Sequence, residues 1–539
     1  MLYFGLGSHN REQGLAEPAG RWAMGSLGFW RRAQGNPGWT AVIEADGSRH
    51  TAGDLLARVN QITRGLRARG LRTGDGIAAV LPNGVAPLEL YLAATQAGWY
   101  FTPINWHFTA PEVAYIATDC EAAALFVHER FADAGVLAAD AAGLPATARF
   151  SYGNVPGFTP VADLRAGQSP EPPRDRTAGS SMHYTSGTTG RPKGVRRPLS
   201  GLDPDDAAEL TSVLLHFFGM TVGPPNVHLV TSPNYHTAVT VFGGGALHLG
   251  HTLVCMDAFD AEQTLALVER HRVTSTHMVP TQFKRMLSLP AATRGRYDLS
   301  SMKWLIHAAA PCPLGIKQAM LDWWGPRVYE YYAATEGGGT IATPQDWLAR
   351  PGTVGAAWPV SEIMVTDEAG NECPPGVPGT VYMKMGVYEF AYFGDPEKTV
   401  ASRLRDFFTV GDIGYVDADG FLFLCDRKSD MIISGGSNIY PAEIEAEIIM
   451  HPKVADVAVF GIPDDEWGEQ VKAVVQPADG VRPGPDLAVE ILAALDGRLA
   501  RMKWPKSVDF IAEMPRDPSG KLLRRRLRNP YWETRGRAI

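Results

Sequence analysis

This sequence contains few cysteines, no long apolar run and no excess of positive charge. The five cysteines, at 120, 255, 312, 373 and 425, are scattered through 539 residues without a CxxC pair. This argues against a disulfide framework or a cysteine-type zinc site and fits a reducing compartment. Lys and Arg number 50 against 58 Asp and Glu, a formal net charge of −8. That balance disfavours nonspecific binding of nucleic acid, which needs a cationic face.

No stretch reaches the 18 consecutive apolar residues typical of a membrane-spanning helix. The nearest candidate, 227–256, is interrupted by Pro233 and by glycines at 243–245. It is therefore interpreted as buried strands and turns. The N-terminus lacks a basic segment followed by a long apolar run, so a secretory signal is not predicted. Together these features predict a cytoplasmic protein without a transmembrane segment.

The chain is 45% hydrophobic, enough for a large core in two to four domains. Short apolar runs alternate with amphipathic segments, which predicts an α/β body with a largely parallel sheet. A capping-box pattern at 51–54 begins one expected helix, and helices are also expected at 261–271 and 280–289. The expected buried strands are 77–81, 124–127, 227–231, 252–256, 274–279 and 303–306.

The sequence pattern changes from about residue 351. From there on, Pro- and Gly-rich turns separate strand-like runs at 379–385 and 421–425. A compact α+β unit follows, with a helix from 441, strands at 454–460 and 471–475, and a helix across 486–502. We therefore expect a large N-terminal domain over 1–425 with a β-rich subdomain at about 351–425. A hinge is expected at 426–430 and a small C-terminal domain at 431–539.

The run YTSGTTGRPKG at 184–194 is the sharpest local pattern. Its glycines allow close backbone approach, its hydroxyls donate hydrogen bonds and its lysine supplies a point charge, as a polyphosphate cradle requires. It is not a Walker A loop, because the lysine does not directly follow the second glycine. A flexible surface loop is the alternative, which the ordered pattern disfavours. The candidate phosphate-binding residues are Thr185, Ser186, Gly187, Thr188, Thr189, Gly190 and Lys193.

This loop resembles the signature of the adenylate-forming superfamily: acyl-CoA synthetases, the adenylation domains of peptide synthetases and firefly-type luciferases. The resemblance covers most of the chain, because further motifs follow in the family's order. The chain looks closest to bacterial acyl-CoA ligases for long-chain, steroid-like or terpenoid acids. The resemblance implies a large N-terminal domain of α/β layers, a mobile α+β C-terminal domain, and the use of ATP, Mg²⁺ and coenzyme A.

Three motifs match the family's acyl and nucleotide segments. SPNYH at 232–236 implies that His236 lies near the reacting carboxylate. YYAATE at 331–336 is similar to the family's Tyr-Gly-x-Thr-Glu, which implies that Thr335 binds phosphate and Glu336 holds Mg²⁺. HAAAP at 307–311 resembles the segment that lines the adenine. The remaining nucleotide-contacting residues implied by these motifs are Ala309, Ala310, Pro311, Tyr331, Tyr332 and Ala333.

Later motifs imply the ribose contacts and the second catalytic state. Asp412, in FFTVGD at 407–412, is expected to accept hydrogen bonds from both ribose hydroxyls, and Arg427 to contact ribose or phosphate. The resemblance implies that Ser434, Gly435 and Gly436 line the pantetheine tunnel once the C-terminal domain rotates. It also implies that Lys521, in PRDPSGKLLR at 515–524, neutralises charge as the carboxylate attacks ATP.

The function implied is an AMP-forming acyl-CoA ligase that converts an acid to its acyl-adenylate and transfers the acyl group to CoA. The anionic acid and the triphosphate repel each other. The resemblance implies that this repulsion is reduced by Mg²⁺ on Glu336, by the hydroxyl loop and by Lys521. The sequence departs from the family pattern at Ala333, at Val410 and in the alanine-rich adenine segment. Two alternatives stay open: an enzyme specialised for thioester formation from a supplied adenylate, and an adenylating enzyme with a non-CoA acceptor.

A bulky hydrophobic acid is expected, lined by Tyr235, residues around 239–245 and 307–309. The glycines at 243–245 either widen this pocket or let a helix and strand pack closely, and the sequence favours neither. A luciferase-like oxidation, a peptide-synthetase unit and a non-enzymatic scaffold are weaker alternatives. Many members of the superfamily are dimers, so a homodimer is considered. For the basic tail at 524–526, three alternatives stay open: contact with CoA phosphates, contact with a membrane surface, or exposure to water alone.

Overall fold

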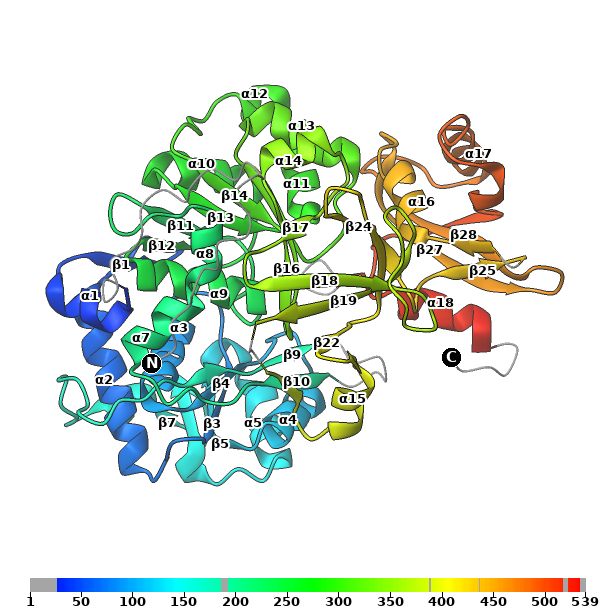
Figure 1. The fold of residues 1–539 in the computed structure, drawn as a ribbon. Helices are drawn as coiled ribbons and strands as arrows, with labels where there is room; N and C mark the ends of the chain where they lie inside the picture. Colours follow the sequence, from blue (N-terminus) through cyan, green and yellow to red (C-terminus); the bar gives the residue numbers. More distant parts are fainter. Residues whose placement is uncertain (1–26, 186–191, 387–388, 436, 517–521, 534–539) are drawn as a thin grey trace.

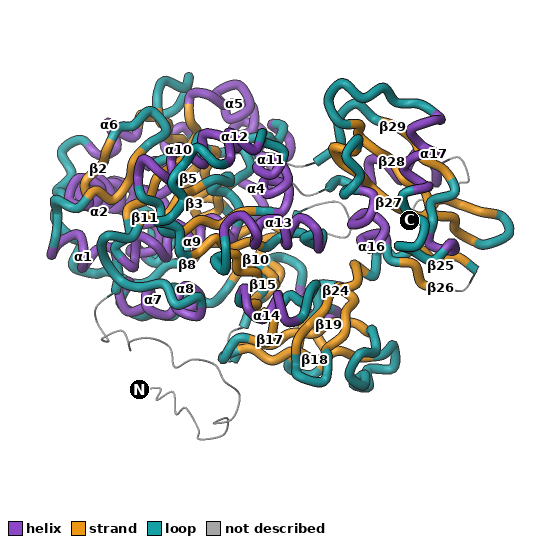
Figure 2. Tube along the Cα trace, turned by 90° about the horizontal axis from the view of Figure 1, so that it is seen from above, coloured by secondary structure: helices purple, strands orange, loops and turns teal. Residues whose placement is uncertain are grey.

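The computed structural model describes residues 27–185, 192–386, 389–435, 437–516 and 522–533. A large body and a smaller C-terminal body lie side by side and are joined after strand β24 (Phe421–Arg427) (Figure 1). The view turned by 90° shows the same two bodies (Figure 2). In the described part of the chain, no helix is long and apolar enough to cross a membrane.

The first sheet of the large body has six strands, all parallel, in the order β7-β6-β5-β3-β4-β8. Along β3, Ile77 and Ala79 join the core on one face, and Ala78 and Val80 join the core on the other. Helices cover both faces, which is why β3 is buried at every position. The strands are β3 (Gly76–Val80), β4 (Tyr100–Pro103), β5 (Ala122–His128), β6 (Arg149–Tyr152), β7 (Thr159–Pro160) and β8 (Ser180–Ser181).

Helices α2 and α3 cover one face of this sheet, and α4 and α5 cover the other. The N-cap Thr51 accepts a hydrogen bond from the Asp54 backbone N–H at 3.1 Å, so α2 begins where the capping pattern predicted. The helices of this part are α1 (Phe29–Gly35), α2 (Ala52–Ala68), α3 (Val85–Ala97), α4 (Ala110–Asp119), α5 (Ala132–Ala141) and α6 (Val161–Arg165).

The second sheet is parallel from β1 to β15 and antiparallel from β15 onward. The β-rich strands expected after 351 do not form a separate sheet, because β17 pairs with both β16 and β24 and continues the large one. Its strands are β1 (Thr40–Ile43), β2 (Arg49–Thr51), β11 (Val227–Val230), β12 (Thr252–Cys255), β13 (Ser275–Met278), β14 (Trp304–His307), β15 (Val328–Ala334), β16 (Gly337–Ala342), β17 (Gly355–Ala357), β18 (Ser361–Thr366), β19 (Gly379–Met385), β21 (Arg403–Leu404), β22 (Phe407–Phe408), β23 (Asp412–Val416) and β24.

The interpretation of 227–256 as strands and turns is wrong at its centre, which is helix α9 (Thr237–Leu249). The helix is buried nearly all round, so it lacks the amphipathic period that marks surface helices. A Cβ on Gly244 would lie 2.8 Å from the Tyr91 ring, and one on Gly245 would lie 3.0 Å from Leu215. These two glycines therefore serve close helix packing rather than a wide pocket.

The other helices of the large body lie around this sheet (Figure 1). They are α7 (Pro204–Thr211), α8 (Val213–Phe217), α10 (Ala261–His271), α11 (Pro280–Leu287), α12 (Ala291–Arg294), α13 (Leu314–Trp324), α14 (Pro344–Ala349) and α15 (Pro396–Ala401). A small third sheet, in the order β20-β10-β9, joins the phosphate-loop region to the β-rich region. Its strands are β9 (His183–Thr185), β10 (Lys193–Arg196) and β20 (Ala391–Tyr392).

The C-terminal body has a five-stranded sheet built around the hairpin of β27 and β28. Its elements are β25 (Ile432–Ser434), β26 (Ser437–Ile439), α16 (Pro441–Ile448), β27 (Val454–Asp464), β28 (Gly468–Pro477), α17 (Pro485–Ala493), β29 (Ser507–Phe510) and α18 (Arg524–Glu533). The helix predicted across 486–502 is too long. Gly497, with φ of +73°, follows soon after α17 and interrupts the helical path.

The basic tail does not begin as a solvated segment. The side chain of Arg524 is 14% exposed and bonds Asp430 at 2.6 Å and Glu445 at 2.7 Å. Arg524 thereby fastens α18 to the region expected as the hinge and to α16.

Candidate active site

The ribose-binding prediction concerns three side chains that the structure brings together. The hydroxyl of Tyr332 donates to Asp412 Oδ2 at 2.6 Å, and Arg427 Nε lies 3.3 Å from Asp412 Oδ1. Asp412 faces Arg427 across the β23–β24 pair. Burial raises the pKa of Tyr332 well above its usual value, which keeps the phenol protonated as a donor. The result is a fixed carboxylate of the kind that binds a vicinal diol.

Thr335 and Glu336 follow β15 and are held from three directions. Thr335 Oγ1 lies 3.1 Å from Thr237 Oγ1 at the start of α9, and the guanidinium of Arg197 donates to the Thr335 carbonyl. The Tyr392 hydroxyl donates to Glu336 Oε1 at 2.7 Å. These contacts fix a hydroxyl and a buried carboxylate next to each other.

The phosphate loop leaves β9 at Thr185 and returns through β10 at Lys193, two residues that face each other across the β9–β10 pair. Lys193 Nζ forms an ion pair with Asp395 at 3.2 Å. The five central candidates, Ser186, Gly187, Thr188, Thr189 and Gly190, lie outside the described residues. The two ends of the loop are thus fixed beside Tyr392 and α15.

His236 is the N-cap residue of α9, directly before Thr237. Its ring lies 4.4 Å from that of Tyr235, measured between centroids. Burial lowers the pKa of His183 and of His277 to about 3, and each loses further affinity for a proton through the nearby His236. His236 therefore stands among neutral imidazoles at the end of the helix that also supports Thr335.

The adenine segment follows β14. Ala308 is buried, whereas Ala309 and Pro311 are exposed and Ala310 is partly exposed. Ala309 has φ of +72°, a left-handed conformation that costs a non-glycine residue roughly 1–2 kcal/mol. The structure therefore keeps an alanine in a backbone conformation that glycine would adopt freely.

The CoA-side prediction falls on the turn between β25 and β26. Gly435 has φ of +57°, and its N–H donates to the Trp467 carbonyl at 2.9 Å. A Cβ on Gly435 would lie 2.5 Å from the Trp467 ring, which itself is 52% exposed. Ser434, in β25, precedes this turn, while Gly436 and Lys521 lie outside the described residues.

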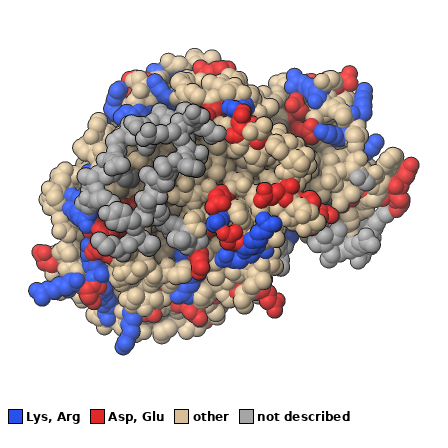
Figure 3. Space-filling model, viewed as in Figure 1, with Lys and Arg blue, Asp and Glu red and all other residues tan. Residues whose placement is uncertain are grey.

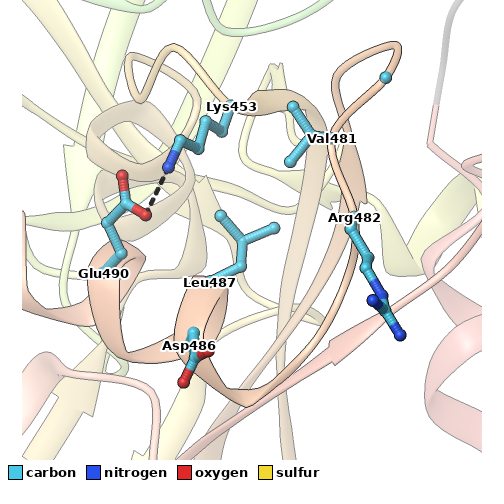
Figure 4. Close-up of a pocket in the computed structure, with 7 residues that line it drawn as sticks. Lys453, Val481, Arg482, Asp486, Leu487 and Glu490 are labelled. Atoms are coloured by element: carbon cyan, nitrogen blue, oxygen red, sulfur yellow. Dashed lines mark hydrogen bonds and ion pairs between the residues drawn. The ribbon is translucent and has the colours of Figure 1, made fainter.

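A hollow of about 340 Å³ lies elsewhere on the C-terminal body, lined by Lys453, Val481, Arg482, Leu487 and Glu490 among others (Figure 4). Lys453 and Glu490 already pair at 2.7 Å. On the face shown in Figure 3, basic and acidic side chains are interspersed, in keeping with the charge balance. None of the residues that line the hollow is among the nucleotide residues described above.

Sequence reasoning missed several of the contacting residues, among them Arg197 and Asp395. Thr237 and Tyr392 support Thr335 and Glu336 from segments 98 and 56 residues away. Trp467 lies against Gly435 but carries no local pattern of its own. Among these residues, Thr237 alone had a sequence signal, which is its hydroxyl directly after His236.

Comparisons with known proteins identify the family of this chain. The family model "AMP-binding enzyme" matches residues 29–386, and the model of the AMP-binding enzyme C-terminal domain matches 443–521. A feruloyl-CoA synthase from Amycolatopsis sp. is 36% identical, over 94% of this chain and 99% of its own. A long-chain-fatty-acid–CoA ligase, FadD13, from Mycobacterium tuberculosis is 31% identical, over 94% and 98%. The crystal structure of ATP-bound MatB from Rhodopseudomonas palustris superposes with a TM-score of 0.78 at 31% identity, over 94% and 99%.

The chain therefore belongs to the AMP-binding enzyme family. This confirms the predicted adenylate-forming superfamily, the α/β fold with a large and a small domain, and the class of AMP-forming acyl-CoA synthetases. Enzymes of this class use ATP, Mg²⁺ and CoA.

The residues present fit Mg²⁺ at Glu336. Within the described ranges, no group of three or more His, Cys, Asp or Glu side chains is arranged to hold a metal ion. A single fixed carboxylate is nevertheless what Mg²⁺ commonly receives from a protein when phosphates and water supply its other ligands. Glu336 is such a carboxylate, oriented by Tyr392.

Proposed function

We propose that this acyl-CoA ligase activates a bulky, largely apolar carboxylic acid. The observation that carries the proposal is an apolar layer contiguous with the nucleotide segments. It contains Ala308 beside the adenine segment and Tyr331 beside Tyr332. Successive residues of a strand point to opposite faces. Tyr332 thus serves Asp412, while Tyr331 faces the apolar layer.

Aromatic rings dominate this layer. The rings of Phe218, Phe242 and Tyr331 contact one another, with centroids 5.7 to 6.0 Å apart in each pair. Phe217 and Trp358 extend the layer from α8 and from the segment after β17, with ring centroids 6.3 Å apart. Aromatic walls favour flat or bulky apolar groups over short polar ones. Relatives named for feruloyl, indoleacetate and long-chain fatty acyl groups agree with such a wall.

In the proposed reaction, His236 and Thr237 lie where the acid's carboxylate meets the nucleotide. Glu336 would hold Mg²⁺, and the cation would reduce the repulsion between the two anions. Thr335 and the hydroxyls at 185–189 orient the phosphates, and Asp412 with Arg427 fixes the ribose. Lys521 compensates charge during attack on the α-phosphate. For the second step, the segment 434–436 with Trp467 borders the path of the thiol.

The experiment is acid-dependent pyrophosphate–ATP exchange with a panel of aryl, fatty, steroid and terpenoid acids, without CoA. We expect exchange with at least one bulky class and no exchange with acetate. A preference for short or charged acids would contradict the proposal. In parallel, CoA is offered with synthetic acyl-adenylates. Thioester without exchange would instead support an enzyme specialised for the second step, and exchange without thioester a non-CoA acceptor.

The domain limits of 1–425, 426–430 and 431–539 remain predictions, as do a homodimer and a cytoplasmic location. Asp426 and Arg427 support the proposed limit, because adjacent side chains bond opposite bodies: Arg427 bonds Asp412, and Asp426 accepts from the Ala442 N–H at 2.9 Å. Light scattering on the purified full-length chain tests the dimer.

A further inference from the structure

A group of three ionisable side chains lies buried in the large body, at the start of the adenine segment. Lys317 Nζ donates to Glu330 Oε2 at 3.2 Å and contacts Nε2 of His307. The side chains of Lys317 and His307 are 0% exposed, and that of Glu330 is 7% exposed. We call these three residues the buried triad. None of them has a role in the chemistry proposed above.

The triad fixes the proton of His307. An ammonium group has only donor hydrogens, so Nε2 of His307 must accept, and the imidazole proton then resides on Nδ1. Burial and the neighbouring Lys317 lower the pKa of His307 well below its usual value, which keeps the ring neutral. Nδ1 is buried and has no hydrogen-bond partner among the described residues. The imidazole is thus oriented by Lys317 and Glu330.

The three residues come from three elements that border the nucleotide. His307 is the last residue of β14 and the first residue of the adenine segment. Lys317 is the fourth residue of α13, the helix that follows that segment. Glu330 pairs with His307 across β14 and β15, two residues before Tyr332. The triad therefore ties the start of the adenine segment to the helix that follows the segment and to the strand that carries Tyr332.

We propose that the buried triad is a positioning device that holds the adenine segment in its strained conformation and thereby sets the preference for adenine nucleotides. The segment contains Ala309 at φ of +72°. Such a conformation persists only where the surrounding structure enforces it. His307 and Lys317 supply the enforcement from either side. The inference rests on the proposed assignment of residues 309–311 to the adenine.

Stability alone does not explain the triad. Burying an ion pair carries a large desolvation cost, and an apolar replacement of the same volume is often neutral or stabilising. Packed apolar side chains at the three triad positions would stabilise the core at least as well. A role in orienting the adenine segment explains why ionisable side chains occupy these positions instead. Lys472 offers a matched comparison, because it is also buried and pairs with Asp509 at 2.6 Å, but lies in β28 of the C-terminal body.

The test is calorimetric binding of AMP and GMP to the full chain, with the melting temperature recorded for each variant. Lys317→Met removes the charge at similar length, and Glu330→Gln keeps an acceptor while removing the other charge. We expect AMP affinity to fall on the order of ten-fold or more, because small displacements in a binding segment are costly. GMP affinity should change less, so the AMP-to-GMP preference narrows. Lys472→Met should lower the melting temperature and leave the preference unchanged.

An unchanged AMP-to-GMP preference in folded Lys317→Met and Glu330→Gln would overturn the inference, as would a wild-type chain that binds AMP and GMP equally. If Lys317→Met does not fold, Glu330→Gln decides. Asp412→Ala tests the proposed nucleotide site separately from the triad. Losing the ribose contact should weaken the binding of AMP and of GMP alike. Unaltered binding of both nucleotides by Asp412→Ala would show that the proposed nucleotide site itself is misplaced.

Discussion

The large and the small body hold their functional residues in different ways. In the large body, side chains from distant strands bond one another directly, as Tyr332 bonds Asp412 and Tyr392 bonds Glu336. The small body presents Gly435 under a half-exposed Trp467. The contact between the bodies includes Lys284, which donates to the carbonyls of Ile449 and Val454 at 3.4 and 2.8 Å.

We expect this difference to separate the two half-reactions. The proposed ribose and Mg²⁺ contacts, Asp412 and Glu336, belong to the large body, whereas Lys521, expected to act in adenylation alone, belongs by sequence to the small one. The interbody contact of Lys284 uses main-chain carbonyls as acceptors. Such a contact depends less on which side chains the small body carries than an ion pair would. A change in the small body should therefore affect one half-reaction, whereas a change in the nucleotide site should affect both.

Lys521→Ala should give the largest and most selective effect. The family resemblance gives this residue charge compensation in adenylation alone, so acid-dependent pyrophosphate exchange should fall by roughly 100-fold or more. Thioester formation from supplied acyl-adenylate should stay within about three-fold. Lys506→Ala, at an exposed position of the same body, is the control and should leave both rates intact. Equal losses in both half-reactions would remove the distinction between the bodies.

Asp412→Ala should reduce both half-reactions. The carboxylate accepts from Tyr332, pairs with Arg427 and is only 8% exposed. Hydrogen bonds to a charged group contribute about 1.5–3 kcal/mol, so we expect roughly a 10- to 100-fold loss of kcat/KM for ATP and for acyl-adenylate. Steady-state kinetics of the two half-reactions measure this. Asp419→Ala, at an exposed turn, is the matched control. A loss confined to one half-reaction would argue against a ribose contact.

Trp467→Ala should reverse the selectivity of Lys521→Ala. The ring covers Gly435 and is 52% exposed, so its removal takes away an apolar wall beside the proposed thiol path without opening the core. We expect KM for CoA to rise about ten-fold, with pyrophosphate exchange unchanged. Trp467→Phe should retain most of the affinity. An effect on exchange as large as that on CoA would contradict the assignment.

The fold was largely predictable because many of its central strands are short, buried and rich in apolar residues, such as β3 and β14. β13 and β14 fall within one residue of their predicted positions. Helix α9 was not predictable, because a helix buried on all sides lacks the period that distinguishes it from strands. Motif resemblance supplied Glu336 and Asp412. Tyr392 and the buried triad have no such motif, since each partner pair forms only when separate strands and helices come together.

The boundary between the bodies offers an effect on stability rather than on either half-reaction. Burial raises the pKa of the Asp426 carboxyl to about 6, against the opposing influence of Arg524. An acid with a raised folded-state pKa binds its proton more tightly in the folded state. Its contribution to stability is therefore complete below the unfolded-state pKa of about 4 and is lost as pH rises to about 6. Asp426→Asn is neutral at every pH and lacks this dependence.

Denaturant unfolding of both proteins at pH 4.5, 5.5 and 7 isolates the Asp426 contribution, because the other carboxylates are common to both. The wild type should lose stability relative to Asp426→Asn as pH rises, by on the order of 2 kcal/mol across the range. The carboxyl accepts from the Ala442 N–H at the start of α16, so the loss should loosen the small body first. Hydrogen exchange of α16 should then respond to pH more than that of α2. A constant difference between the two proteins would mean that Asp426 is ionised in the folded protein throughout, with Arg524 fully offsetting its burial.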